Sequence, residues 1–252
     1  MAIKTRKISD WLSANGQAIT NASKPTMEKA IKADIGQLYD GVFIMYHRKS
    51  DNFPLAVRVS AWESYQNNGE VADGVLLVEG GRQLVIAPTE GVDKKWSSKP
   101  VSLSDTSGSV QISGVTTTTD RQTAFNNFAG RANTTAIING STSSNVTNTE
   151  DYAAGFCNKY SRTNANGIGL TAGRWWLPSE GELMMIWANF DKINYALSKI
   201  SGATQLAQSW YWSSTQSSEA GAWYLDMNVG SANTSYKSRQ IRARPVSAFL
   251  NS

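Results

Sequence analysis

The sequence has little that would support covalent or metal chemistry. Among its 252 residues there is one cysteine, Cys157, and one histidine, His47. No disulfide can form within these residues, and a His-based metal site or a His-dependent catalytic triad is nearly excluded. His47 ends a predicted strand in a polar stretch, where we expect a solvated turn residue. The sequence therefore predicts no metal, no cofactor and no catalytic residue.

Charge and long apolar runs are also scarce. Charged residues make up 17% of the chain, the net charge is +4, and the Lys and Arg residues are scattered. This pattern does not indicate a nucleic-acid partner or an anionic membrane surface. No apolar run approaches the length of a membrane span. The first residues, MAIKTRKISDW, lack the apolar segment of a signal peptide, so we expect synthesis in the cytoplasm.

Aromatic residues, in contrast, are abundant and clustered. The chain has nine Trp and nine Tyr, and six of the Trp lie between positions 175 and 223. Because an indole ring buries a large area, such a cluster usually belongs to a core. We therefore expect Trp175, Trp187, Trp212 and Trp223 to form a scaffold in or near the core.

The pattern of the first half predicts short helices followed by strands. Residues 1 to about 40 form amphipathic helical pieces, and strands follow at 42–46 and 54–62. Two further strands flank Glu79-Gly80-Gly81, a good hairpin turn because Gly tolerates positive φ. Residues 91–104 are predicted to be a loop, and 97–150 a long loop-rich insertion with ordered pieces.

The second half predicts an α+β fold. Helices are expected at 150–161, where Cys157 is buried, and at 179–200, where Ser179 and Glu182 form a capping box. Strands are expected at 211–215 and 223–229, with a closing strand at 241–246. We divide the chain into a segment 1–68, for assembly or docking, and a domain 69–252.

Residues 223–229 alternate strictly between apolar and polar side chains. Strand side chains repeat with period two, so one face carries Trp223, Leu225, Met227 and Val229. The opposite face carries Tyr224, Asp226 and Asn228, and it continues through Gly230 into a polar loop, 231–239. Two interpretations remain open: an ordinary half-buried strand with its loop, or a recognition surface on a rigid scaffold.

Seven short motifs occur in an order similar to that of C-type lectin-like domains of bacteria and phages. They lie at 72–81, 133–138, 152–157, 175–183, 211–215, 222–223 and 244–249. This group belongs to the same broad branch as the formylglycine-generating enzyme fold. The resemblance implies two helices packed on a small twisted antiparallel sheet, with long loops and a short N-terminal helical segment. Within that branch, the C-terminal layout resembles the variable proteins of diversity-generating retroelements.

That resemblance implies which positions vary. In this family an error-prone reverse transcription step rewrites adenines, so an AAC codon becomes any codon ending in C. Such codons cannot encode Trp, Gln, Glu, Lys or Met. In the region of about 209–245 the positions that are fixed by this criterion are Trp210, Trp212, Gln216, Glu219, Trp223, Met227, Lys237 and Gln240. The candidate ligand-binding positions are Ser209, Ser217, Ser218, Tyr224, Asp226, Asn228, Ser231, Asn233, Ser235, Tyr236, Ser238 and Arg239.

The function that the resemblance implies is receptor binding without catalysis. The expected protein stands at a phage tail-fibre tip, binds a cell-surface protein or glycan receptor, and forms a homo-oligomer, commonly a trimer. Its location would be the virion, or the host cytoplasm before release. Two alternatives stay open. An oxidoreductase of the formylglycine-generating kind would need a pair of cysteines, and a calcium-dependent glycan-binding lectin would need several oxygen ligands around Asp226.

Overall fold

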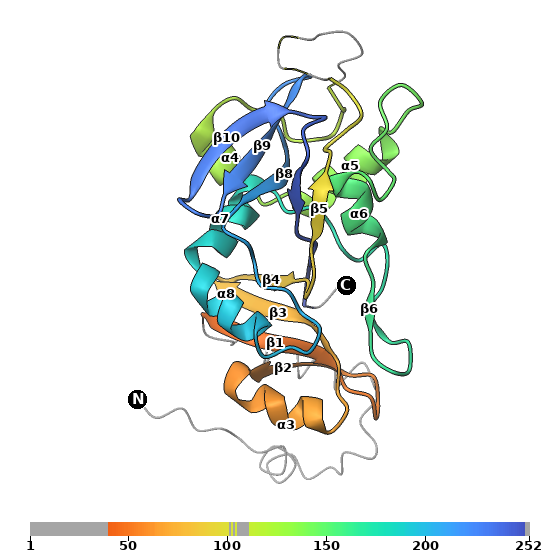
Figure 1. Cartoon of the computed structure of the whole chain (residues 1–252), viewed down its shortest axis with the longest axis vertical. Helices are drawn as coiled ribbons and strands as arrows, with labels where there is room; N and C mark the ends of the chain where they lie inside the picture. Colours follow the sequence, from red (N-terminus) through yellow and green to blue (C-terminus); the bar gives the residue numbers. More distant parts are fainter. Residues whose placement is uncertain (1–39, 101, 103, 105–110, 250–252) are drawn as a thin grey trace, which may run out of the picture. The chain divides into compact units, whose positions relative to one another are not determined.

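The computed structural model describes residues 40–100, 102, 104 and 111–249. The chain divides between residues 39 and 40, and the fold below is that of the unit beginning at Asp40. The helices expected within residues 1–40, and the assembly role given to them, lie outside the described residues. The described part is a mixed α+β structure with antiparallel sheets and short helices (Figure 1). It contains no helix long and apolar enough to cross a membrane.

The first of two five-stranded sheets has the order β12-β4-β3-β1-β2 and is antiparallel throughout. Its strands are β1 (Gly41–His47), β2 (Pro54–Arg58), β3 (Ala72–Glu79), β4 (Arg82–Ile86) and β12 (Val246–Ser247). The predicted hairpin turn is confirmed, since Gly80 and Gly81 have φ of 54° and 77°. Because β1 pairs with β2 and with β3, this sheet contains strands from both sides of the boundary predicted at residue 68.

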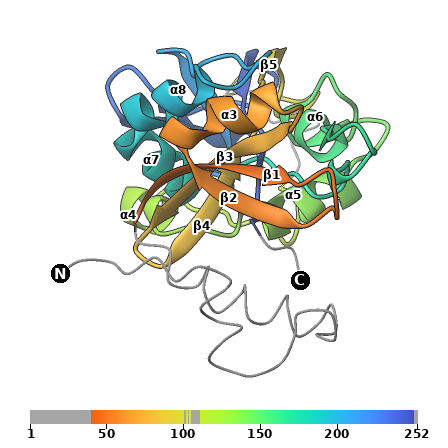
Figure 2. The ribbon, with the colours of Figure 1, turned by 90° about the horizontal axis from the view of Figure 1, so that it is seen from below.

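Two helices cover one face of this sheet, α3 (Trp62–Asn67) and α8 (Phe190–Leu197) (Figure 2). The strand predicted at 54–62 is too long. It ends at Arg58, and a 3-10 turn, η2 (Val59–Ala61), leads into α3. The Trp62 ring stacks on Tyr65, and its indole N–H donates to Gln66 Oε1 at 3.2 Å. These contacts join residues three and four apart, which face each other only on a helix.

The second sheet has the order β10-β9-β8-β11-β5. Its strands are β5 (Gly91–Lys94), β8 (Trp210–Gln216), β9 (Gly221–Asp226), β10 (Ser231–Tyr236) and β11 (Ile241–Ala243). All pairs are antiparallel except β11 with β8. Two segments predicted as loops, 91–94 and 231–236, are strands here. Neither segment alternates between apolar and polar residues. Strand β5 forms by pairing with β11, which is distant in sequence, and β10 forms by pairing with the preceding strand β9.

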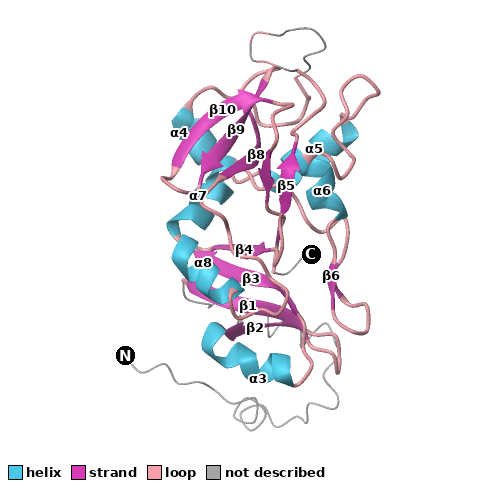
Figure 3. Ribbon diagram, in the orientation of Figure 1, coloured by secondary structure: helices cyan, strands magenta, loops and turns pink. Residues whose placement is uncertain are grey.

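Helices lie on both faces of the second sheet (Figure 3). On one face are α5 (Gly130–Asn139), which contacts β8, and α6 (Ala153–Lys159), which contacts β5 and β11. On the other is α7 (Glu180–Ala188), with α4 (Arg121–Phe125) against it. The ordered pieces expected within the insertion 97–150 are thus α4 and α5. A two-stranded hairpin, β6 (Arg162–Thr163) with β7 (Gly169–Leu170), follows α6.

The helix predicted at 179–200 is two helices. The capping box of Ser179 and Glu182 starts α7 as expected, but α7 ends at Ala188 and α8 starts at Phe190. Asn189 stands at the break, where its Nδ2 donates to Met185 O (3.1 Å) and to Glu79 Oε2 (3.0 Å). An Asn side chain that competes for backbone and sheet partners favours an interruption of the helix.

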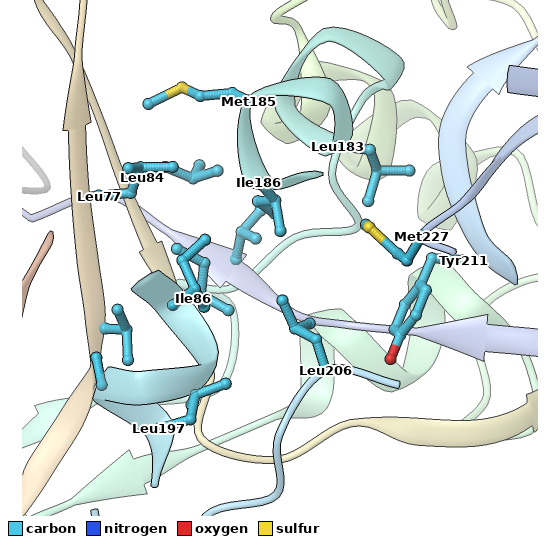
Figure 4. Packing of buried hydrophobic residues seen from close by; sticks show 14 of the residues in the cluster. Leu77, Leu84, Ile86, Leu183, Met185, Ile186, Leu197, Leu206, Tyr211 and Met227 are labelled. Atoms are coloured by element: carbon cyan, nitrogen blue, oxygen red, sulfur yellow. The ribbon is translucent and has the colours of Figure 1, made fainter. Parts of the chain in front are cut away.

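A single large core joins the two sheets (Figure 4). From α7, Leu183 and Ile186 contribute to it together with Leu77 and Ile86 of the first sheet and Met227 next to the second. The expected Trp scaffold is confirmed for three of its members, because Trp175, Trp212 and Trp223 are 1%, 0% and 4% exposed. Trp187 is half-buried and packs against the edge of this core.

The expectation of a solvated His47 is wrong. The side chain is buried, and its Nδ1 lies 2.6 Å from Asp73 Oδ2 on the neighbouring strand β3. Burial raises the pKa of Asp73, and the bond to His47 opposes that rise. The pair is 26 residues apart, so only the β1–β3 register brings it together.

Glu180, the first residue of α7, is a buried acid. Its backbone N–H donates to Thr215 Oγ1 at 3.2 Å, but neither carboxyl oxygen has a hydrogen-bond partner in the described part of the chain. Burial raises the pKa of Glu180 to about 8, and the nearby Ser213 hydroxyl lowers it by less. The carboxyl group is therefore protonated in the folded protein at neutral pH.

We predict that Glu180→Gln flattens the pH dependence of stability. A raised folded-state pKa gives stability that is present below about pH 4.5 and lost as pH rises through about 8. Urea titrations across this window should show the slope of the free energy of unfolding reduced by about 1.4 kcal/mol per pH unit. Part of the slope remains because burial also raises the pKa of Glu182. Exposed Glu63→Gln is the control, and an equal change in both variants would refute the prediction.

Candidate functional site

The register of β8, β9 and β10 places several candidate residues on one face of the second sheet. Asp226 lies opposite Trp210 on β8 and Ser231 on β10, and the next row joins Trp212, Tyr224 and Asn233. Residues that are directly opposite across antiparallel strands share a face. We add Arg239, whose side chain covers Trp210, and call the set the display face. Its members are Trp210, Tyr224, Asp226, Ser231, Asn233 and Arg239.

Trp210 is the centre of the display face. The Arg239 guanidinium lies 4.4 Å from the centroid of its ring, and the Tyr224 ring is 4.9 Å away at an interplanar angle of 35°. The indole N–H donates to Asp226 Oδ2 at 3.0 Å. Two candidate residues from β9 and one from the segment after β10 thus contact one half-buried tryptophan of β8.

Sequence reasoning missed Trp210 as a site residue, because codon type placed it only among the fixed positions. A signal for it was present. Trp210 and Trp212 are two apart on one strand, so they share a face. Pairing of that strand with the alternating segment would have set Trp210 beside Tyr224 or Asp226.

The turn that follows β9 is anchored to the core. Asp226 Oδ1 accepts a hydrogen bond from the backbone N–H of Asn228 at 2.9 Å. Gly230 has φ +67°, and a Cβ there would lie 2.3 Å from the Trp187 ring. Val229 was predicted to face the core and is 60% exposed. The strand ends at Asp226, so period two no longer governs the side chains of the turn.

Three candidates predicted to face solvent are buried instead. Ser217 and Tyr224 are each 8% exposed, and Ser235 is 3% exposed. Tyr224 lies between Trp210 and Trp212, and its ring is 6.4 Å from the Trp212 ring in an edge-on arrangement. Burial raises the pKa of the Tyr224 hydroxyl. Both Tyr224 and Trp212 belong to a second hydrophobic cluster, separate from the core described above, which also includes Ile137 of α5 and Cys157 of α6.

The other candidates are at least partly exposed, but they do not all lie together. They are Ser209, Ser218, Asp226, Asn228, Ser231, Asn233, Tyr236, Ser238 and Arg239. Tyr236 is on the opposite face of β10 from Asn233, because the two are an odd number of residues apart. Ser218 is in the β8–β9 turn, where its Oγ accepts from the Gly221 N–H at 3.0 Å. Ser238 donates its backbone N–H to Pro100 O at 3.3 Å.

Two polar residues that an AAC codon cannot produce lie inside the protein near this face. Lys237 is 0% exposed, its ammonium donates to Gln216 Oε1 at 2.7 Å, and it stands 4.6 Å from the centroid of Trp96. Burial lowers the pKa of Lys237 to about 7, and Glu219 opposes the change. Gln216 also bonds the backbone N–H and C=O of Ile112, so it fastens the insertion to β8.

No group of three or more His, Cys, Asp or Glu side chains in the described ranges could hold a metal ion. The thiol of Cys157 is fully buried, which raises its pKa. A shallow hollow of about 580 Å³ is lined by Thr116, Asp120, Gln122, Thr123, Asn126, Asn127, Phe128 and Ala129. None of the candidate residues lines it, and the Asp120 carboxylate already caps α4 through Thr123.

Comparisons with known proteins show only a distant structural likeness. No family model and no curated protein sequence matches the chain. A solved fimbrial protein from Bacteroides ovatus ATCC 8483 is similar over 84% of this chain, with 15% identity and a TM-score of 0.42. The chain spans about half of that protein, 49% of its length. This likeness is too distant to support an inference about function.

Proposed function

We propose that the chain is a non-enzymatic receptor-binding protein and that its display face is the binding surface. The observation that carries this proposal is the arrangement around Trp210 of β8, where Tyr224 and Asp226 of β9 meet Arg239 from the segment after β10. A fixed aromatic side chain offers a large contact area at little entropic cost, and neighbouring Ser and Asn residues adapt their hydrogen bonds. Interface energies concentrate on such anchored Trp, Tyr and Arg residues.

The class we propose is the C-type lectin-like variable protein of a diversity-generating retroelement. Motif residues far apart in sequence meet in the structure, which supports this class. Trp176 and Val246 exchange both backbone hydrogen bonds, at 2.8 and 3.0 Å. Among the residues that AAC codons cannot produce, Gln216 and Lys237 are buried and Trp210 is half-buried. The partly exposed residues around Trp210, which are Asp226, Ser231, Asn233 and Arg239, can all arise from such codons.

The partner we propose is a cell-surface protein or glycan receptor, bound by a phage tail-fibre protein. A homotrimer would present three display faces to the same cell and raise the avidity. The protein would reside in the virion, or in the host cytoplasm before release.

We predict that four substitutions on and beside the display face abolish receptor binding and leave the fold intact. The variant combines Asp226→Ala, Asn228→Ala, Asn233→Ala and Arg239→Ala. All four side chains are at least partly exposed, and Asn228→Ala and Asn233→Ala should each cost about 0.5 kcal/mol of the free energy of unfolding. Asp226→Ala and Arg239→Ala also remove contacts with Trp210, so each should cost about 1 kcal/mol. Fluorescently labelled protein is tested by flow cytometry on a panel of intact bacterial strains. We expect binding of the unaltered chain to at least one strain and none by the variant.

A matched control carries four alanines on exposed positions of α3, α8 and the turn after α8, at Glu63, Asn67, Asp191 and Lys199. It should bind cells as the unaltered chain does. Tyr224 is left unchanged because its ring is buried between two indoles. Undiminished cell binding by the display-face variant would contradict the proposed site, and equal loss in the control would show that the effect is not local.

A further inference from the structure

Strand β10 forms an open edge of the second sheet. It pairs with β9 along Ser231–Tyr236, and it is the terminal strand of the order β10-β9-β8-β11-β5. Its sequence, SANTSY, contains no charged residue and no proline, and the β9–β10 register has no bulge. Exposed edges with these properties are templates for pairing with another strand.

The backbone bonds of this hairpin show which groups point outward. Lys237 N donates to Ala220 O at 3.2 Å, which continues the register of Ser235 with Ala222. In an antiparallel pair the bonded positions alternate, so Ser235, Asn233 and Ser231 also bond to β9. The N–H and C=O groups of Ala232 and Thr234 therefore point away from β9. Within the described residues, no other backbone group bonds to them.

The other described sheet edges carry features that discourage strand addition. Strand β2 begins with Pro54 and ends with Arg58, while β5 carries Asp93 and Lys94 and contacts α6. Strand β12 has only two residues. Proline, charged side chains, a covering helix and shortness are the usual protections of an edge. Strand β10 has six residues and none of these protections.

We propose that the β10 edge takes up an extended segment of a protein receptor as an added strand. This inference rests on the proposed function and selects protein over glycan as the ligand class. The added strand would bond to the outward groups of Ala232 and Thr234. Its alternate side chains would then lie beside Asn233 and Ser231 on the display face, because side chains opposite each other share a face.

Such a binding mode suits a surface whose side chains change. Backbone hydrogen bonds to Ala232 and Thr234 do not depend on the side chains of either partner, so they remain when the neighbouring residues are exchanged. Ser231, Asn233 and the cluster around Trp210 would select which ligand side chains are accepted. In strand addition generally, main-chain hydrogen bonds provide the affinity and the flanking side chains provide the specificity.

The test uses the full chain, immobilised, and a display library of linear peptides of about eight residues. Selected peptides are measured by fluorescence polarisation against the unaltered chain, Thr234→Pro and Thr234→Val. Proline removes an outward N–H and leaves the bonds to β9 intact, which edge strands tolerate. We expect binding weakened about tenfold or more by Thr234→Pro and nearly unchanged by Thr234→Val.

A second measurement keeps the proposal testable if Thr234→Pro fails to fold. Amide hydrogen exchange of Ala232 and Thr234 in the unaltered chain should slow by about tenfold or more when a selected peptide is bound. Recovery of no peptide, equal binding by Thr234→Pro, or unchanged exchange at both amides would overturn the edge proposal. So would a concentration-dependent dimer that Thr234→Pro dissociates, because the edge would then pair with a second copy.

These outcomes are separable from failure of the proposed function. If cells are still bound and the four-alanine variant loses that binding, the display face remains the receptor site even when no peptide pairs with β10. If the display-face variant still binds cells and Thr234→Pro still binds the selected peptides, both proposals fail.

Discussion

The Arg244→Ala protein is expected to lose about 3–5 kcal/mol of its free energy of unfolding. Arg244 is completely buried, and its guanidinium donates to Glu90 Oε2 at 3.2 Å. It also donates to Pro88 O at 3.1 Å and Thr204 O at 2.9 Å. Alanine would leave these three acceptors without their charged partner in the interior, and unpaired buried groups are among the largest sources of instability.

The Glu90 cluster explains why this effect should be large. The same carboxylate receives Arg242 Nη1 at 2.6 Å and the Tyr211 hydroxyl at 2.5 Å. Glu90 thereby joins β8 to β11. Its partner Arg244 adds the segments around Pro88 and Thr204 to the same cluster. Burial lowers the pKa of Arg244, and Glu90 opposes that change. The pair with Glu90 and the hydrogen bonds from Nη1 and Nη2 stabilise the buried cation, although its Nε has no hydrogen-bond partner in the described part of the chain.

Urea unfolding of Arg244→Ala beside Arg48→Ala measures the difference. Arg48 forms an ion pair with Asp51 in which both side chains are more than 40% exposed. Exposed pairs contribute about 0–1 kcal/mol, so Arg48→Ala should change stability little. Similar unfolding midpoints for the two variants would contradict the role given to the Glu90 cluster.

Trp212→Ala should be the other severe substitution, with a loss of about 3–5 kcal/mol. The side chain is 0% exposed, and its indole N–H donates to Lys94 O at 2.8 Å, which ties β8 to the end of β5. Its ring also meets the edge of Tyr224. Removal would create a cavity beneath the display face, so ligand binding should weaken together with stability.

Trp187→Ala is the matched comparison. The ring is half-buried and packs against the turn at Gly230 and the edge of the core, so the loss of stability should be smaller than for Trp212→Ala. Differential scanning calorimetry on both proteins provides the test. A larger loss for Trp187 than for Trp212 would show that the core has been located wrongly.

Local signals in the sequence were enough for much of the fold. The capping box at Ser179 and the glycine turn after Glu79 depend on residues within a few positions of each other. Long-range pairings could not be predicted in the same way. The contact of His47 with Asp73 spans 26 residues and that of Glu90 with Arg244 spans 154. Strand β10 has no apolar alternation, and it forms because Gly230 turns the chain back onto β9.

The predicted orientation of the side chains of 223–226 is confirmed as far as the strand continues. Tyr224 and Asp226 do lie on the face opposite Leu225. The rule fails beyond Asp226, where the turn exposes Val229. It also gives no information on what covers a face, so the burial of Tyr224 between indoles could not be foreseen. Trp210 was missed because residue type alone assigned it to the scaffold.

The most direct test of the central claim, that the display face is a rewritten ligand surface, is to sequence the DNA on both sides of the coding region. We predict a near-copy of the region encoding residues 209–245, close to a reverse transcriptase gene. Its differences from the coding sequence should be adenines at codons such as those of Tyr224, Asp226 and Arg239. Flanking DNA without such a copy, or a copy that differs mainly at the codons of Trp212, Gln216 and Lys237, would contradict the claim.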